Sequence, residues 1–235
     1  MNSLLINKLD TYKEINMKKL ITAIFGFALI SFSASAIEKK IGFTAALTDF
    51  ETAGTETVKS SGDKTSTEVS ERVVVPSLFF EISSDAGLGI GIDFVPGDAE
   101  LGNKSKTKVD IDTDDTADNG GTNKASAEIS GHQTIYVKIP VKAAFLKIGY
   151  VSADVETTEK LDTGTTYGNE TVNGTMVSLG IDKDMPNGTF IRAELAYTDY
   201  DDITLNGSAD TDSVKNKVDA DVDATSLRLS VGKAF

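Results

Sequence analysis

The chain has 235 residues and a formal net charge of −13, which argues against a nucleic acid as its partner because phosphate groups would be repelled. It contains no cysteine, and this excludes disulfide bonds, thiolate metal sites and cysteine nucleophiles. With 20 glycines, no tryptophan and many threonine, valine and isoleucine residues, the composition favours strands and turns over helices.

The first predicted element is a secretory signal peptide at residues 17–36. It opens with lysines, continues with an apolar stretch too short to span a membrane, and ends in the small residues Ala34-Ser35-Ala36. We therefore expect cleavage near Ala36 and a mature chain of residues 37–235, with residues 1–16 as an over-long start. A single transmembrane anchor is the alternative, and the short apolar stretch fits it less well.

The mature chain contains eight segments in which apolar residues alternate with polar or small ones, and this period of two predicts eight β-strands. Three connections between the segments are tight turns, whereas four are long: residues 49–72, 97–128, 154–172 and 199–223. If neighbouring strands are antiparallel, every tight turn lies at one end and every long connection at the other. This asymmetry is typical of outer-membrane barrels. We therefore predict a single all-β domain, an eight-stranded antiparallel up-and-down transmembrane β-barrel with short periplasmic turns and long external loops.

Charged residues on the polar face of these segments assign that face to the barrel interior. Four of them are acidic and four are basic, so they cancel in an otherwise acidic chain, as a confined interior requires: Glu81, Asp93, Asp182, Glu194, Lys138, Lys147, Arg192 and Arg228. We expect these residues to form a charge network inside the barrel, with the apolar face toward lipid. A soluble lipocalin-like periplasmic barrel, with the apolar face inward around a lipid, is an alternative.

The four long connections carry a larger acidic excess than the whole chain, so the excess of negative charge lies at one end of the barrel. Some alternation continues within them, and we expect protruding hairpins rather than irregular loops. Such hairpins are available for adhesion, for an extracellular protein partner, or for divalent bridging to lipopolysaccharide.

Two further patterns suggest site chemistry, and neither is specific. The sole histidine, His132, follows Ser130 and could form a Ser-His-carboxylate arrangement with a loop aspartate, but serine and aspartate are abundant here. The acidic run of residues 110–118 resembles the start of a calcium loop, yet the EF-hand pattern requires Gly at Asp115 and Glu at Gly121. We therefore predict no catalytic residues, no cofactor and no metal site, and we expect the chain not to be an enzyme.

The last segment, TSLRLSVGKAF, resembles the sorting signal of bacterial outer-membrane proteins. That signal is a terminal Phe preceded by alternating apolar residues, and it is matched here by Leu227, Leu229, Val231 and Phe235. Lys233 departs from the pattern. The mature chain as a whole resembles the superfamily of OmpA-type transmembrane barrels, OmpX and opacity proteins. The resemblance implies a monomer in the outer membrane of a Gram-negative bacterium, surrounded by bilayer and lipopolysaccharide and recognised by the barrel-assembly machinery.

Barrel size decides what the interior can do. Eight strands enclose a space just wide enough for side chains, so we predict a plugged barrel with a structural or surface-interaction role. A narrow porin-like channel, in which the inner charges line a conduit, is the alternative.

Overall fold

The computed structural model describes residues 37–57, 64–108, 121–160, 166–208 and 217–235. The predicted signal peptide at residues 17–36, the preceding residues 1–16 and the acidic run of residues 110–118 lie outside the described residues. None of the described segments forms a helix with the length and hydropathy needed to cross a bilayer.

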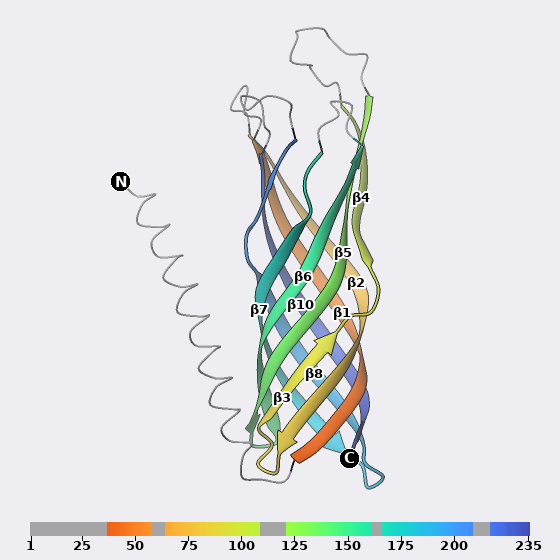
Figure 1. Cartoon of the computed structure of the whole chain (residues 1–235), viewed down its shortest axis with the longest axis vertical. Coiled ribbons are helices and arrows are strands. Elements are labelled where there is room, and N and C mark those ends of the chain that lie inside the picture. The colour runs from red at the N-terminus through yellow and green to blue at the C-terminus, as the bar shows by residue number, and fades with distance from the viewer. Residues whose placement is uncertain (1–36, 58–63, 109–120, 161–165, 209–216) are drawn as a thin grey trace, which may run out of the picture.

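The described residues form one antiparallel sheet that closes into an elongated barrel (Figure 1). Its ten strands are β1 (Ile37–Thr57), β2 (Lys64–Ser84), β3 (Gly89–Phe94), β4 (Ala99–Lys108), β5 (Gly121–Val141), β6 (Ala144–Lys160), β7 (Glu170–Asp184), β8 (Thr189–Tyr200), β9 (Ile203–Asn206) and β10 (Lys217–Ala234).

Eight arms make up the ring. Strands β3 and β4 form one arm interrupted at residues 95–98, and β8 and β9 form another interrupted at residues 201–202. Both β3 and β4 pair with β5, and both β8 and β9 pair with β10. Pairing of β1 with β10, from Lys40↔Ala234 to Thr57↔Lys217, closes the sheet. The predicted eight-stranded antiparallel barrel is therefore confirmed.

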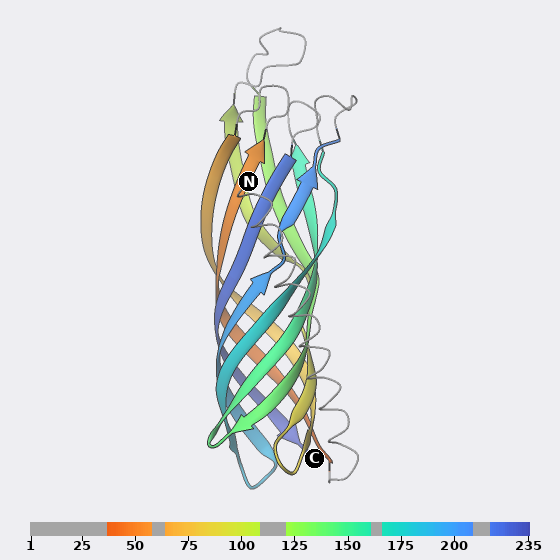
Figure 2. The ribbon, with the colours of Figure 1, turned by 90° about the vertical axis from the view of Figure 1, so that its left-hand side faces the viewer.

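Tight turns gather at one end of the barrel, which we call the turn end (Figure 2). They join β2 to β3, β5 to β6 and β7 to β8, and a backbone with positive φ closes each of them: 81° at Gly87, 56° at Lys142 and 78° at Gly188. The opposite end, the outer end, carries the long connections. Strand structure extends far into them, since β1 continues to Thr57 and β2 begins at Lys64.

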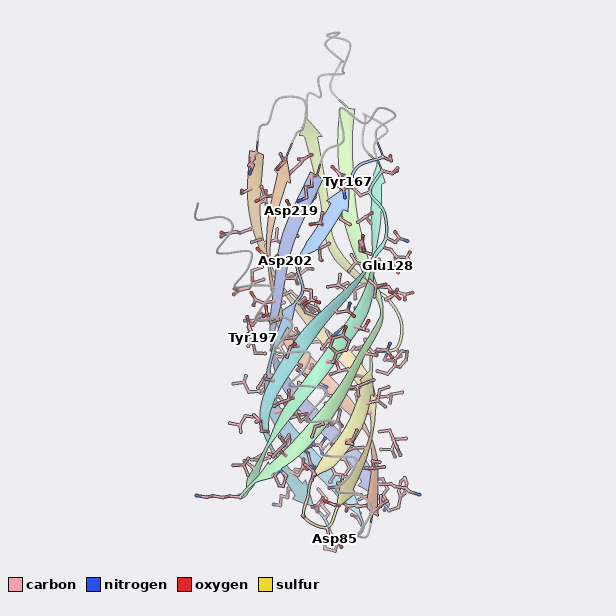
Figure 3. All side chains as sticks on the ribbon, turned by 60° about the vertical axis from the view of Figure 1, so that its left-hand side comes forward. Asp85, Glu128, Tyr167, Tyr197, Asp202 and Asp219 are labelled. Carbon is pink, nitrogen blue, oxygen red and sulfur yellow. The ribbon has the colours of Figure 1, made fainter. Side chains whose placement is uncertain are left out.

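A belt of apolar side chains surrounds the barrel nearer the turn end. Leu179, Leu195 and Leu229 are each 59% exposed, although large aliphatic side chains belong among the most buried residues of water-soluble proteins. Tyr197, 48% exposed, marks the outer edge of this belt, where aromatic side chains favour the boundary between lipid and water (Figure 3). The apolar face therefore points outward, which is the reverse of a lipocalin-like barrel.

The barrel wall divides in its outer half. Strand β2 pairs with β3 only over Leu78–Ser83, and within the described residues β4 pairs only with β5. The outer half thus divides into two sheets, β9–β10–β1–β2 and β4–β5–β6, and the first residues of β7 pair with β6 at the border of the second sheet. Residues Lys64–Ser77 of β2 are bonded to β1 on one side. Their other side, which we call the β2 edge, has no strand partner among the described residues.

Candidate functional site in the barrel interior

All eight charged residues assigned to the interior from the sequence have side chains on the inner face, and the structure brings them together in two groups. The first group lies around Arg192 of β8, whose side chain is fully buried. Its guanidinium donates two hydrogen bonds to Glu81 of β2, at 2.9 and 3.0 Å, and its Nε donates to Asp182 of β7 at 2.6 Å. Lys138 of β5 completes the group, with Nζ 2.8 Å from Glu81 and 2.9 Å from Asp182.

The second group lies nearer the outer end. Lys147 of β6 places its Nζ 2.7 Å from Glu194 of β8. Arg228 of β10 donates through Nη2 to Asp93 of β3 at 2.5 Å, and its Nε lies 3.8 Å from Glu194. Each acid and base of the eight is thus part of an ion pair. Two pairs, Arg192–Asp182 and Arg228–Glu194, join neighbouring strands. The others join strands that are not neighbours in the sheet and therefore cross the lumen: Arg192–Glu81, Lys138–Glu81, Lys138–Asp182, Lys147–Glu194 and Arg228–Asp93.

Aromatic side chains fill the space between the ions. Tyr136 is 1% exposed, its hydroxyl donates to Glu81 at 3.0 Å, and its ring centroid lies 4.3 Å from Lys147 Nζ. The rings of Phe79, Phe145 and Phe190 stack near the Arg192 guanidinium, with centroids 5.0 to 5.5 Å from its Cζ. Such cation–π contacts stabilise a cation that has left water. The interior at this level is a packed mixture of ions and rings.

Two further inward side chains, Phe190 and Lys40, are not among the eight residues predicted from the sequence. Phe190 is fully buried beside Arg192, and its position next to the outward Ile191 already indicates an inward side chain. Lys40, also inward, pairs with Glu38 at 3.2 Å and with Asp184 at 3.3 Å near the turn end. Alternation along β1 and β8 could have identified both.

A glycine makes room for Tyr136. A Cβ on Gly91 of β3 would lie 2.4 Å from the Tyr136 ring, closer than any real contact. The ring is held by its hydrogen bond to Glu81, so the small residue opposite is a steric requirement.

His132 and Ser130, which were considered for catalysis, do not form a Ser-His pair. The His132 ring shares a hydrogen bond of 3.1 Å with Tyr200 through Nε2, and its Nδ1 has no hydrogen-bond partner. A backbone irregularity in the β5–β6 pairing separates Ser130 from the segment that begins at Gln133. No group of three or more histidine or acidic side chains among the described residues could hold a metal ion.

The four residues of the predicted assembly signal lie on the lipid side of β10 and at its end. Leu227, Leu229, Val231 and Phe235 are 52, 59, 50 and 67% exposed. Phe235 also completes the ring, since its backbone exchanges two hydrogen bonds of 3.0 Å with Lys39 of β1.

Comparison with known proteins identifies the fold. No family model matches the chain, and no curated protein sequence matches it. Its structure is similar to that of the outer membrane protease OmpT from Escherichia coli, with a TM-score of 0.52 and 7% identity over 86% of this chain and 99% of that one.

Two other solved structures are similar at a lower score. The outer membrane protein OprG from Pseudomonas aeruginosa has a TM-score of 0.48, 13% identity, and coverage of 86% of this chain and 96% of its own. The outer membrane protein AlkL has a TM-score of 0.48, 8% identity, and coverage of 86% and 91%. Together with the apolar belt and the ion pairs inside, the likeness to OmpT shows that this chain has the fold of a small outer-membrane β-barrel protein.

Proposed function

We propose that this chain is an outer-membrane protein whose barrel is a plugged scaffold for a protein-binding surface outside the membrane. The observation that carries the first half is the set of ion pairs across the lumen. Arg192 alone joins β8 to β2 and β7, and the rings of Phe79, Phe145 and Phe190 surround it. A lumen filled in this way leaves no continuous path for hydrated ions. A narrow porin-like channel is the competing function.

Conductance in planar bilayers tests the plug. The purified mature chain should give no steady single-channel current, whereas Arg192→Ala, which removes the side chain that is hydrogen-bonded to both Glu81 and Asp182, should give intermittent openings. Arg72→Ala is the matched control, because Arg72 pairs with Asp49 at the outer surface and should leave the bilayer closed. A steady, ion-selective current from the unmodified protein would overturn the plug and favour the channel.

The β2 edge supports the second half of the proposal, a surface-interaction role. Its backbone N–H and C=O groups have no strand partner over many residues, and an extended peptide can pair with such an edge. Pro76, which lacks an N–H, is tolerated within β2 because strands accept proline where its nitrogen faces an open edge. The other boundary between the two outer sheets is bridged by hydrogen bonds between Ser208, which follows β9, and Thr166, which precedes β7. Ser208 N donates to Thr166 O at 2.9 Å, and Thr166 Oγ1 lies 2.8 Å from Ser208 Oγ.

Charge defines the partner. Asp219, Asp221 and Asp223 of β10 lie beside β1 in the same outer sheet, whose other edge is β2. Acidic residues dominate the outer connections of the sequence. We therefore infer a basic segment in extended conformation, for which a short peptide of alternating lysine and valine is the experimental probe.

Two proline variants on one strand test this edge. The β1–β2 register is continuous, so the nitrogen of residue 70 faces the same side as that of Pro76, and the nitrogen of residue 71 faces β1. Ser70→Pro should weaken binding of the labelled peptide roughly tenfold while stability is unchanged, because it removes one backbone donor and that donor faces the open edge. Glu71→Pro should lower stability by breaking a β1 pair. Equal peptide affinity for Ser70→Pro and the unmodified protein would exclude edge pairing.

The remaining parts of the proposal concern the surroundings of the chain. The apolar belt supports a bilayer and lipopolysaccharide environment after export, and the outward residues Leu227, Leu229, Val231 and Phe235 support recognition of β10 by the barrel-assembly machinery. Phe235→Ser should slow assembly in cells, observed as less of the heat-modifiable form on gels. OmpT is a protease by name, and its likeness to this chain extends to the fold only.

A further inference from the structure

A cavity lies inside the barrel on the outer side of the ion pairs. Its volume is about 70 Å³, and side chains from β1, β2, β5, β7, β8 and β10 line it. Most of the lining is apolar, contributed by residues such as Ala46, Val75, Ile129 and Met176. Arg228 of the outer group of ions is part of its wall, so the cavity ends where the proposed plug begins.

Three of the lining residues each carry a buried polar side-chain atom that has no hydrogen-bond partner: Ser77 Oγ, His132 Nδ1 and Arg228 Nε. They are the complete set of such side-chain atoms among the described residues, and all three belong to residues that line this one cavity. Ser77 is only 2% exposed. Because a buried polar group without a partner is destabilising, the occurrence of all three around one small cavity requires an explanation.

The chemistry of the three atoms defines a ligand. Arg228 Nε can only donate a hydrogen bond, the Ser77 hydroxyl can donate or accept, and His132 Nδ1 can do either according to its tautomer. The charge of Arg228 is already compensated by Asp93, at 2.5 Å, so an anion in the cavity would add an unbalanced charge to a low-dielectric site. The complement is an uncharged oxygen acceptor.

The size of the cavity limits the apolar part. A cavity of about 150 Å³ holds benzene, and this one, at about 70 Å³, has roughly half that volume. We propose that it is a binding site for a small uncharged molecule with one carbonyl or hydroxyl oxygen and a short aliphatic body, as in a ketone or alcohol of about four carbons. The oxygen lies against Arg228 and Ser77, and the aliphatic part lies against Met176 and Ala46.

Methyl NMR of the mature chain in lipid nanodiscs tests this site. With ¹³C-methyl methionine, two signals report: Met176 lines the cavity, whereas Met185 lies in the exposed turn between β7 and β8. Titration with 2-butanone should shift Met176 along a saturating curve and leave Met185 unchanged. Butyrate, which has a similar size but carries a charge, should bind at least several-fold more weakly.

Two variants separate binding in the cavity from partition into lipid. Ala46→Leu fills the cavity and should abolish the Met176 shift, while Ala53→Leu, on the exposed outer side of the same strand, should preserve it. Ser77→Ala should weaken 2-butanone roughly fivefold, as expected for one lost hydrogen bond. If Ala46→Leu fails to fold, Ser77→Ala alone decides.

Three outcomes would overturn the proposal. The first is a Met176 shift that never saturates, which indicates that only water occupies the cavity. The second is a shift at Met185 equal to that at Met176. The third is an affinity for butyrate equal to that for 2-butanone. The plug is tested separately by conductance, so a conducting barrel with a saturable Met176 shift would refute the plug and retain this site.

Discussion

At the scale of single residues, the interior illustrates why buried charges occur in complete sets. Glu81 has no exposed surface, and it receives hydrogen bonds from Arg192 and Tyr136 and an ion pair from Lys138. An ion removed from water without partners costs several kcal/mol, so each member depends on the others. Replacing one partner therefore costs more than the pair itself contributes.

Arg192→Leu tests this dependence. The change keeps an apolar side chain in place but leaves Glu81 and Asp182 without their guanidinium, and we expect it to lower the free energy of unfolding by about 3–5 kcal/mol. Urea titration in lipid vesicles, followed by the gel shift of the folded barrel, measures the loss. The exposed Arg72→Leu is the control and should change little. Equal behaviour of the two variants would mean that the buried set adds nothing to stability.

Gly232→Ala tests the close approach of β10 to β1. A Cβ at position 232 would lie 2.4 Å from the backbone oxygen of Ile41 and 2.6 Å from the Phe190 ring, so a strand must shift at the seam that closes the barrel. We expect a loss of about 1–3 kcal/mol, which is typical of overpacking. Gly54→Ala on β1 has its nearest contact at 3.9 Å and should be tolerated in the same urea titration. A tolerated Gly232→Ala would show that β10 and β1 have room for a Cβ at this position.

Part of this interior could be predicted from the sequence. Alternation places Glu81, Lys147 and Arg192 on the inner face, because side chains on a strand point to opposite faces in turn. The partners across the lumen, such as Glu81 for Arg192, could not be predicted, since these ion pairs depend on the relative register of strands that are not neighbours. That register is set by the closure of the whole ring, which no local pattern records.

At the scale of elements, the strands extend well past the apolar belt. Asp202 and Asp219 lie in the outer half and Asp85 lies in a turn at the other end, as Figure 3 shows. Alternation in the sequence predicted that the long connections would continue as hairpins, and β10 indeed begins at Lys217. The interruption between β3 and β4 coincides with Pro96 and Gly97, where φ is 85°. The wall divides at this point and leaves the β2 edge, and this division could be recognised only from the pairing of all the strands.

The pairing of β9 with β10 should depend on pH. Thr204 Oγ1 donates to the Asp219 carboxylate at 2.7 Å, and Lys217 Nζ lies 2.7 Å from it. The hydrogen bonds of Lys217 and then of Thr204 lower the pKa of Asp219. A lowered folded-state pKa means that the stabilisation is present above the unfolded-state pKa and is lost as the pH falls through the folded-state value.

Amide hydrogen exchange at β9 and β10 measures this effect. After correction for the intrinsic pH dependence of exchange, opening of the Val218↔Leu205 pair should become more frequent in the acidic range. Asp219→Asn should show the same frequency at all pH values. A pH response that persists in Asp219→Asn would assign it to another group.

At the scale of the whole molecule, orientation follows from which face meets lipid. The exposed belt and the ion pairs inside are two aspects of one arrangement, because a closed sheet in lipid must present apolar side chains outward and satisfy its polar groups inward. The sequence predicted this orientation from charge balance alone. The cavity beyond the plug was not predictable, since it depends on side chains from six strands that meet only when the ring closes.

A charge placed on the belt tests the orientation directly. Leu78, 50% exposed, lies midway along the apolar outer face of β2, and Ser70 lies on the same face of the same strand beyond the belt. Leu78→Arg should lower the free energy of unfolding by about 2–4 kcal/mol, because the guanidinium enters hydrocarbon. Ser70→Arg should have almost no effect, because its guanidinium stays in water. Titration of both variants in vesicles of thinner and thicker lipids sharpens the comparison: the cost of Leu78→Arg should rise with thickness. If the two variants cost the same, the belt does not face lipid.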